Sequence, residues 1–354
     1  DRGSKSFKAE LKAAGLDMDE MNYRERSFDE FLPWSHLDMG MDEGYLEMEW
    51  KRSVDEAYTP PCVQGCKRCG VCKSVKRIDV KGPHGTWSYE APKWTEQFPI
   101  VMGDTYRHGG VSKAPYESLN LAFHVGDEAQ NVRANRAIVT DHLGVNPTRI
   151  SCGNQVHGLK AVEITENLVG AGALGEDTAI ADCDAVFTRL PNVPLFLFTA
   201  DCVGVGIYDA KHHAIATVHA GWRGAIGHLP VLTIEAMKET YGTEFKDCYV
   251  YLGPSIGPES FEVDVELGKR FELAWRAMTK RNAADVVNYP GDKLDKAYIN
   301  LWNFIAEGLI INGVPREHIA IGGTDSVIES DCYSYRREAG TTGRMALFGM
   351  LQER

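Results

Sequence analysis

The stretch from residue 195 to residue 224, LFLFTADCVGVGIYDAKHHAIATVHAGWRG, constrains the fold of this chain more than any other. It begins with an apolar run over Leu195–Thr199, which predicts a buried strand. Two further runs rich in β-branched and apolar residues follow, at Val203–Tyr208 and Ala214–Val218. The polar break Asp209–His212 between them suits a hairpin loop. The stretch therefore predicts three strands, the last two paired as a hairpin.

This hairpin is predicted to bring two chemically active side chains together. If its loop is closed at the middle, position 208 pairs with 213, and Cys202 pairs with His219. Opposed side chains share a face of the sheet, with Cβ atoms roughly 4.5–5.5 Å apart. A thiol and an imidazole at that separation can hold one metal ion or act as a nucleophile with its base. The following Ala220–Gly224 adds glycines, a tryptophan and an arginine, so we expect a functional site here.

Composition and charge exclude several classes of protein. The length of 354 residues suggests two domains, or one large and one small. The net charge of −12 argues against nucleic acid as the main partner, and no run of eighteen apolar residues indicates a membrane span. We find no signal peptide, and four of the nine cysteines fall within eleven residues, which favours metal binding over disulfides. We therefore expect a cytoplasmic protein without nucleic-acid or membrane partners.

The N-terminal segment, residues 1–72, is predicted to be small, acidic and mostly helical, with a short helix over residues 42–57. It ends in a basic loop with a C-x3-C-x2-C-x2-C spacing, formed by Cys62, Cys66, Cys69 and Cys72. Thiolates packed this closely can share a soft metal, and basic neighbours lower their pKa values. The spacing suits an iron–sulfur cluster better than a zinc ribbon. Zinc, and a loop without metal, stay open as alternatives.

The same segment resembles part of a known family. The run from Arg24 to Gly40, followed by Thr59-Pro-Pro-Cys62 and the Cys-rich loop, is similar to the C-terminal tail of cobalamin-binding radical SAM proteins over about residues 20–72. The barrel and the cobalamin domain of that family have no counterpart in this sequence, so no radical chemistry is carried over. The resemblance implies a natural fusion with an upstream radical SAM region.

A second, larger domain is predicted over residues 98–354, after a linker over residues 73–97 that glycine and proline punctuate. Strands are expected at residues 98–104, 249–252 and 319–321, and helices at residues 127–143, 265–281 and 297–312. Because strands and helices alternate irregularly, the pattern favours an α/β fold with mixed sheets over a regular doubly wound one.

Three arginines near the C-terminus, Arg336, Arg337 and Arg344, lie among glycine and threonine residues. Guanidinium groups in that setting can bind phosphate or carboxylate bidentately, and a surface ion-pair network is the alternative.

The run Gly170–Gly175 satisfies the G-x-G-x-x-G dinucleotide fingerprint. No helix is expected to follow it, so it is predicted to be a loop.

Eight motifs occur in order over residues 98–354 and resemble the YfiH-like polyphenol oxidase, or laccase-domain, family. They are Arg107-His-Gly-Gly-Val-Ser with Pro115-Tyr-Glu-Ser-Leu-Asn-Leu, His124-Val-Gly-Asp, Asn135-Arg136, Gln155-Val-His157-Gly, Thr199-Ala-Asp-Cys202, Val218-His219-Ala-Gly-Trp-Arg-Gly, Leu252-Gly-Pro-Ser-Ile-Gly-Pro, and Ser334-Tyr-Arg-Arg with Thr342-Gly-Arg.

The resemblance implies a layered α-β-β-α fold and a zinc site that is also the catalytic centre. By motif, its ligands map onto His157, Cys202 and His219. It also implies phosphorolysis of adenosine, inosine and methylthioadenosine, with some deamination of adenosine. Purine nucleosides and phosphate are therefore the expected small-molecule partners. The positions expected to bind substrate are Arg107, Asn120, Gln155, Arg223, Arg336 and Arg344.

The name of that family suggests copper chemistry, but the histidines of this sequence do not have the spacing that a multicopper site requires. A multicopper laccase holds its coppers largely through His-x-His pairs, and this chain has eleven histidines but no such pair. A His2Cys set with an open fourth position is instead typical of catalytic zinc, although copper can occupy it. Three alternatives stay open. They are a copper-dependent phenol oxidase, an amidase acting on a peptidoglycan precursor with Cys202 as nucleophile and His219 as base, and a non-enzymatic docking module stabilised by zinc with four protein ligands.

Overall fold

The computed structural model describes residues 24, 26–27, 30, 45–55 and 74–354, and the chain divides into two units, residues 1–73 and 74–354. In the first unit, helix α3 (Tyr45–Val54) lies within the helix predicted over residues 42–57. An ion pair between Glu47 and Lys51, one turn apart, supports it. The Cys-rich loop and the metal or cluster predicted there lie outside the described residues.

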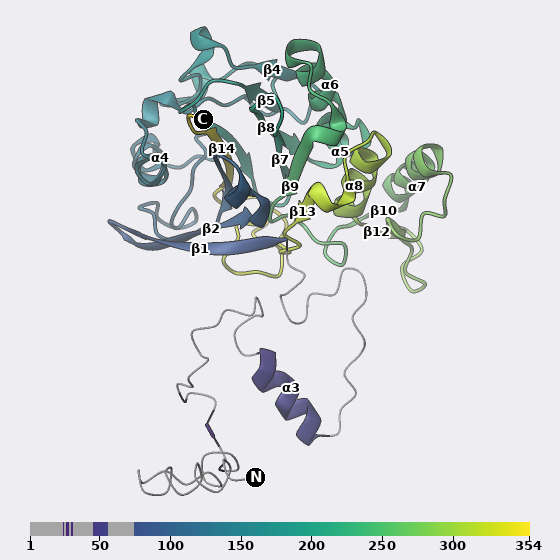
Figure 1. The fold of residues 1–354 in the computed structure, drawn as a ribbon. Helices are drawn as coiled ribbons and strands as arrows, with labels where there is room; N and C mark the ends of the chain where they lie inside the picture. The colour runs from purple at the N-terminus through teal and green to yellow at the C-terminus, as the bar shows by residue number, and fades with distance from the viewer. Residues whose placement is uncertain (1–23, 25, 28–29, 31–44, 56–73) are drawn as a thin grey trace, which may run out of the picture. The chain divides into compact units, whose positions relative to one another are not determined.

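Two sheets form the centre of the second unit (Figure 1). The first is antiparallel, with the order β1-β2-β3-β14-β6, and its strands are β1 (Val75–Gly82), β2 (Gly85–Pro92), β3 (Ile100–Thr105), β14 (Met345–Leu351) and β6 (Leu195–Thr199). The second is mixed, with the order β13-β9-β7-β8-β5-β4, and its strands are β13 (Ile319–Ile321), β9 (Cys248–Leu252), β7 (Val203–Asp209), β8 (Ala214–Ala220), β5 (Ala185–Thr188) and β4 (Ala161–Glu163). A smaller sheet consists of β10 (Glu262–Asp264), β12 (Lys296–Ile299) and β11 (Val287–Asn288).

Helices cover the outer faces of the two central sheets. Figure 1 shows α4 on one side of the sheets and α5, α6 and α8 on the other, with α7 beside the small sheet. The helices of this unit are α4 (Ala129–Leu143), α5 (Trp222–Ile226), α6 (Leu229–Tyr241), α7 (Val265–Thr279) and α8 (Leu301–Ile311). Short 3-10 helices lie at Lys93–Gln97, Pro147–Arg149, Glu166–Leu168, Glu176–Thr178, Phe245–Asp247 and Arg316–His318.

Strand β6 shows why the layers stack. Leu195 and Leu197 belong to the core between the two sheets, whereas Phe196 and Phe198 belong to the core beneath α4. Successive side chains of a strand face opposite sides. A strand that is covered on both faces therefore reads as a continuous apolar run, as this one does. The predicted α/β fold, with α-β-β-α layers and mixed sheets, is confirmed.

The interval predicted to be a linker, residues 73–97, is instead part of the first sheet. Strands β1 and β2 pair from Val75 opposite Pro92 to Gly82 opposite Gly85. Gly82 and Gly85, which suggested a linker, flank the two-residue turn Pro83-His84 of this hairpin, and Gly85 has a φ of +112°. The second unit therefore begins near residue 74 rather than residue 98.

The central hairpin forms as predicted, but its register differs by two residues. Asp209 pairs with Ala214, and Gly204 rather than Cys202 pairs with His219. The turn is shifted because the Asp209 carboxylate accepts hydrogen bonds from the backbone N–H groups of Lys211 and His212, which fixes the turn after Asp209. His213, with a φ of +54°, completes it.

The other predicted elements are largely present. Helices α4 and α7 and strands β3, β9 and β13 lie at the expected positions. The helix predicted over residues 297–312 begins only at Leu301, because residues 296–299 form strand β12 and Asn300 caps the helix by accepting a hydrogen bond from the N–H of Asn303. The loop prediction for Gly170–Gly175 is confirmed, and its carbonyl groups accept hydrogen bonds from the buried Arg136. Among the described residues, no helix has the length and apolarity that a membrane span requires.

Candidate metal centre and substrate pocket

The three residues predicted to be metal ligands come together at one end of the second sheet. His219 lies in β8, Cys202 immediately precedes β7, and His157 lies in the loop before β4. One potential ligand atom from each residue lies within 4.8 Å of the other two. The Cys202 Sγ atom is 3.8 Å from His157 Nε2, and the two imidazole ring centres are 4.7 Å apart. Among the residues that the structure describes, this group offers three protein ligands, the number that a catalytic zinc site uses.

A neighbouring glycine leaves the space between these ligands clear. A Cβ atom on Gly221 would lie 3.0 Å from both Cys202 Sγ and His157 Cδ2. The backbone at Gly221, with φ of −63° and ψ of 176°, is one that any residue adopts. Glycine is therefore required here for side-chain space and not for backbone conformation.

Gly221→Ala is expected to weaken zinc binding about tenfold while the fold is retained, because the methyl group would separate Cys202 from His157. Competition with a chromophoric chelator measures the affinity. Gly291→Ala is the matched control, since a Cβ there meets nothing within 4 Å. Equal affinities in the two variants would contradict this role of Gly221.

The centre is electrostatically coupled. Burial disfavours the thiolate of Cys202, but His219 and His157 outweigh that effect and lower the pKa of Cys202 to about 6. Burial likewise disfavours charge on His219, but Cys202 and Asp184 raise the pKa of His219 to about 9. The thiolate that a soft metal requires is therefore stabilised near neutral pH by its own neighbours.

Asp184 connects two of the candidate ligands. Its carboxylate accepts hydrogen bonds from His219 Nδ1 at 2.8 Å and from the backbone N–H of His157 at 2.9 Å. Burial raises the pKa of this carboxyl, but the hydrogen bonds from His219 and from backbone N–H groups outweigh it and lower the pKa. The sequence contains no local pattern that distinguishes Asp184 from other aspartates.

A cavity of about 490 Å³ opens onto the three candidate ligands, a volume typical of small-molecule sites. Its apolar lining consists of Phe198, Ala200, Trp222, Ile256, Phe261 and Leu301. Its polar lining, apart from the candidate ligands, includes His124, Gln155, Asp201, Tyr335, Arg336 and Arg344. The cavity therefore combines aromatic surface, two guanidinium groups and the candidate metal centre.

The two arginines that line the cavity are held by backbone groups. Arg336 donates from Nη1 to the Glu262 carbonyl at 3.0 Å, and its own N–H donates to the Asp201 carboxylate at 2.6 Å. Arg344 donates from Nη1 to the carbonyls of Thr342 and Gly343, at 2.9 Å each. Within the described part of the chain, neither guanidinium group forms a salt bridge with a carboxylate. Their charge is therefore available to an anionic substrate.

The remaining predicted substrate residues take other positions. Gln155 lines the cavity, but its amide is paired with the backbone of Phe198. Asn120 is buried and accepts a hydrogen bond from the N–H of Arg344. It therefore fixes the backbone of that arginine without lining the cavity itself. Arg223 is exposed, with its guanidinium 4.2 Å from the Trp222 ring centre. Arg107 is hydrogen-bonded to Glu338, and neither Arg107 nor Arg223 is among the cavity-lining residues.

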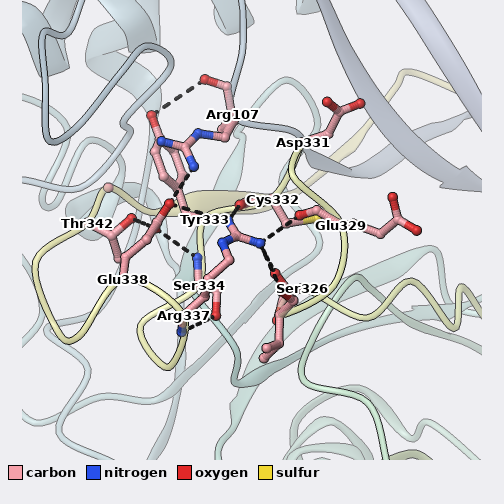
Figure 2. Close-up of polar contacts among 12 residues, drawn as sticks. Arg107, Ser326, Glu329, Asp331, Cys332, Tyr333, Ser334, Arg337, Glu338 and Thr342 are labelled. Carbon is pink, nitrogen blue, oxygen red and sulfur yellow. Dashed lines mark hydrogen bonds and ion pairs between the residues drawn. The ribbon is translucent and has the colours of Figure 1, made fainter. Parts of the chain in front are cut away.

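Arg337 has a different role from its neighbour Arg336. Figure 2 shows its guanidinium in the middle of the loop that precedes β14. It donates to the carbonyls of Ser326 at 2.8 Å and Glu329 at 2.9 Å, and also to the carbonyl of Cys332. The adjacent Glu338 accepts hydrogen bonds from Arg107, from Thr342 and from the N–H of Ser334. This network holds the loop that presents Tyr335 and Arg336 to the cavity.

Arg337→Ala is expected to lower the free energy of unfolding by about 2–3 kcal/mol, because several carbonyl groups lose a charged donor. Denaturant unfolding measures this change. Arg337→Lys restores only part of the loss, since one ammonium group cannot replace a planar fork of donors. Arg276→Ala, which removes an exposed pair with Glu272, is the control with little effect. An Arg337→Ala protein as stable as this control would refute the structural role.

Several cavity residues were missing from the predicted site. Asp201 precedes Cys202 and has a φ of +90°, a conformation that is costly for a residue with a Cβ. Its carboxylate accepts hydrogen bonds from Ser326 and from the N–H of Arg336. These bonds connect the turn that carries Cys202 to the loop that carries Arg336. His124, Phe261 and Tyr335 also line the cavity. His124 and Tyr335 stand within the family-like motifs quoted above, which was the available signal for them.

Comparisons with known proteins bear on the family and the fold of the chain. Residues 101–352 match the family model described as multi-copper polyphenol oxidoreductase laccase. The chain is 30% identical over 249 residues to a purine nucleoside phosphorylase of Bacteroides thetaiotaomicron, a match that covers 70% of this chain and 89% of that protein. It is 33% identical over 257 residues to purine nucleoside phosphorylase YlmD of Geobacillus stearothermophilus, with coverage of 70% and 89%. The crystal structure of hypothetical protein YfiH of Bacillus licheniformis is similar with a TM-score of 0.70 at 26% identity, covering 77% of this chain and 97% of that chain.

The family match leaves residues 20–72 uncovered. The resemblance of that segment to a radical SAM tail therefore gains no support from it and stays a prediction, as does the fusion that it implies.

Proposed function

Because this chain belongs to the multi-copper polyphenol oxidoreductase laccase family, we propose that it is a zinc-dependent purine nucleoside phosphorylase acting on adenosine, inosine and methylthioadenosine. Relatives that are named purine nucleoside phosphorylases and cover 70% of the chain support this proposal. The observation that carries it is the cavity itself, where two guanidinium groups and an aromatic lining face a His2Cys centre. We further propose some adenosine deaminase activity and a cytoplasmic location, which the free thiols of the described cysteines favour.

The donor set fits zinc. One thiol and two imidazoles have ligand atoms within 4.8 Å of one another, and Gly221 leaves their centre free of a Cβ. Two histidines and one cysteine with a further position free are typical of catalytic zinc, and copper accepts the same ligands. When bound by His157, Cys202 and His219, the metal supplies Lewis acidity toward a substrate atom.

The residues around the centre suit phosphorolysis. In this reaction a phosphate oxygen forms a bond to C1′ of the ribose while the bond between C1′ and the purine nitrogen breaks. The purine leaves with the electron pair and takes up a proton. We assign phosphate to Arg336 and Arg344, whose guanidinium groups neutralise its charge and orient the attacking oxygen. Phe261 and Trp222 provide aromatic surface for the purine ring.

Incubation of the zinc-loaded protein with adenosine, with and without phosphate, tests the proposal. Adenine and ribose 1-phosphate should form only when phosphate is present, and chromatography separates them from inosine, the product of deamination. Omission of protein controls for spontaneous breakdown. Absence of turnover by protein with full zinc content would falsify the nucleoside proposal.

An amidase is the second candidate, favoured by the lowered pKa of Cys202 next to His219. In that reaction the Cys202 thiolate attacks an amide carbonyl, and His219 protonates the leaving amine. Removal of metal distinguishes the two candidates. Amidase activity on a peptidoglycan precursor should rise when zinc is removed and the thiolate is freed, whereas phosphorolysis should be lost.

A further inference from the structure

We propose that Asp184 is the positioning residue of the metal centre, because this single buried carboxylate orients two of the three candidate ligands, His157 and His219. This inference rests on the metal-binding role proposed above. It concerns how the chain builds the centre, and no comparison assigns a role to this aspartate.

The carboxylate of Asp184 receives four hydrogen bonds. The residue is 1% exposed and lies immediately before β5. Its Oδ1 atom accepts from His219 Nδ1 at 2.8 Å and from the N–H of His157 at 2.9 Å. Its Oδ2 atom accepts from the N–H groups of Val156 at 3.1 Å and Gly158 at 2.8 Å. An ionised carboxylate has about four acceptor sites, so this one is fully used.

These bonds determine how both histidines face Cys202. Because Nδ1 of His219 is held by Asp184, Nε2 is the nitrogen left to bind a metal. His157 has a φ of +59°, a left-handed conformation that is uncommon for a residue with a Cβ. Three consecutive N–H groups that converge on one carboxylate support this conformation.

Asparagine cannot replace Asp184, although it has the same shape. If its NH2 group takes the place of Oδ2, it faces the N–H donors of Val156 and Gly158. If it takes the place of Oδ1, it faces the N–H of His157 and donates to His219 Nδ1. His219 then carries its proton on Nε2 and cannot bind a metal through that atom. Either orientation disturbs at least one of the two ligands.

The chain contains a control for this substitution at the turn between β7 and β8, the end of that hairpin away from His219. Asp209 is fully buried, accepts from the N–H groups of Lys211 and His212, and has its Oδ2 atom 2.8 Å from His212 Nδ1. Like Asp184, it is a buried carboxylate that contacts backbone N–H groups and one imidazole Nδ1, with two N–H donors where Asp184 has three, and it has no candidate metal centre beside it. A purely structural cost of Asp→Asn should appear equally in both variants.

The test compares the zinc affinities and melting temperatures of the wild-type chain, Asp184→Asn and Asp209→Asn. Competition with a chromophoric chelator measures affinity. Asp184→Asn should bind zinc about 10- to 100-fold more weakly, the effect typical of residues that orient metal-bound histidines. Asp209→Asn should lower the melting temperature without changing the affinity. Wild-type affinity in Asp184→Asn overturns the inference, and failure of the wild-type chain to bind zinc overturns the metal proposal as well.

A measurement on the wild-type protein decides the question if Asp184→Asn does not fold. Nitrogen-15 NMR of the zinc-loaded chain should show His219 with its proton on Nδ1, shifted downfield and protected from exchange by the Asp184 carboxylate. His212 in the hairpin turn serves as the internal reference. A His219 ring bound to zinc through Nδ1, or an unprotected Nδ1 proton, overturns the inference.

Discussion

Replacement of Cys202 by alanine is expected to abolish zinc binding and to lower the rate of adenosine phosphorolysis by more than about a hundredfold. The reason is that Cys202 supplies the only thiolate among the three candidate ligands, within 4.8 Å of both imidazoles. Loss of a ligand itself should exceed the 10- to 100-fold effect that is typical of residues behind the ligands. Metal analysis of the purified protein and chromatography of the reaction products measure the two effects.

Cys248→Ala is the control for this experiment. Its thiol is also free and fully buried, but it lies in β9 and contacts the Glu244 carbonyl, away from the cavity. This variant should keep its zinc and its activity, apart from a modest loss of stability due to the deleted sulfur. Phosphorolysis at the wild-type rate in Cys202→Ala would show that the assigned centre is not the catalytic one.

The sequence was sufficient to predict the central strands because they are buried on both faces. Leu195–Thr199 and Val203–Asp209 read as apolar runs for that reason. The predicted register was wrong by two residues, yet it still placed Cys202 near His219. Side chains alternate with a period of two along a strand, so an error of two residues preserves the face. An error of one residue would have placed the two on opposite sides.

The linker error had a different physical cause. Gly82 and Gly85 were taken as signs of an irregular segment, but they flank the two-residue turn Pro83-His84 of a β-hairpin. The buried Trp87 and Tyr89, which pack beneath α4, show that this hairpin belongs to the core. Local composition cannot distinguish a linker from a tight turn. The pairing of β2 with β3, which ties this hairpin into the sheet, involves residues outside the interval 73–97.

The parts of the site that escaped prediction depend on contacts between distant positions. Asp184 contacts a histidine 35 residues away in sequence, and Asp201 bonds to Ser326 across 125 residues. No local spacing encodes such contacts. His157 was assigned only through family resemblance for the same reason, since its loop is brought to the hairpin by the Asp184 carboxylate. The different roles of Arg336 and Arg337 likewise could not be predicted from the sequence, because they depend on the folded loop. The loop directs Arg336 to the cavity and Arg337 to backbone carbonyl groups.

Arg344→Ala is expected to reduce phosphorolysis about 10²- to 10³-fold, mainly through weaker use of phosphate, while zinc binding is unchanged. Arg344 lines the cavity and is fixed through its backbone N–H by Asn120 and through Nη1 by two carbonyl groups. A pre-oriented guanidinium group of this kind binds a phosphate without first being ordered. Initial rates measured over a range of phosphate concentrations, with adenosine saturating, test the expectation.

The proposed deamination of adenosine is the internal control, because it consumes water and no phosphate. If Arg344 acts on phosphate, inosine formation by Arg344→Ala should stay close to the wild-type rate while adenine formation falls. Arg344→Lys keeps the charge but loses the fork of donors, so it should recover part of the phosphate dependence. Arg276→Ala, on the exposed face of α7, should behave as wild type. An equal fall in both reactions would show that Arg344 shapes the whole cavity, and an unchanged phosphate dependence would assign the anion to Arg336 instead.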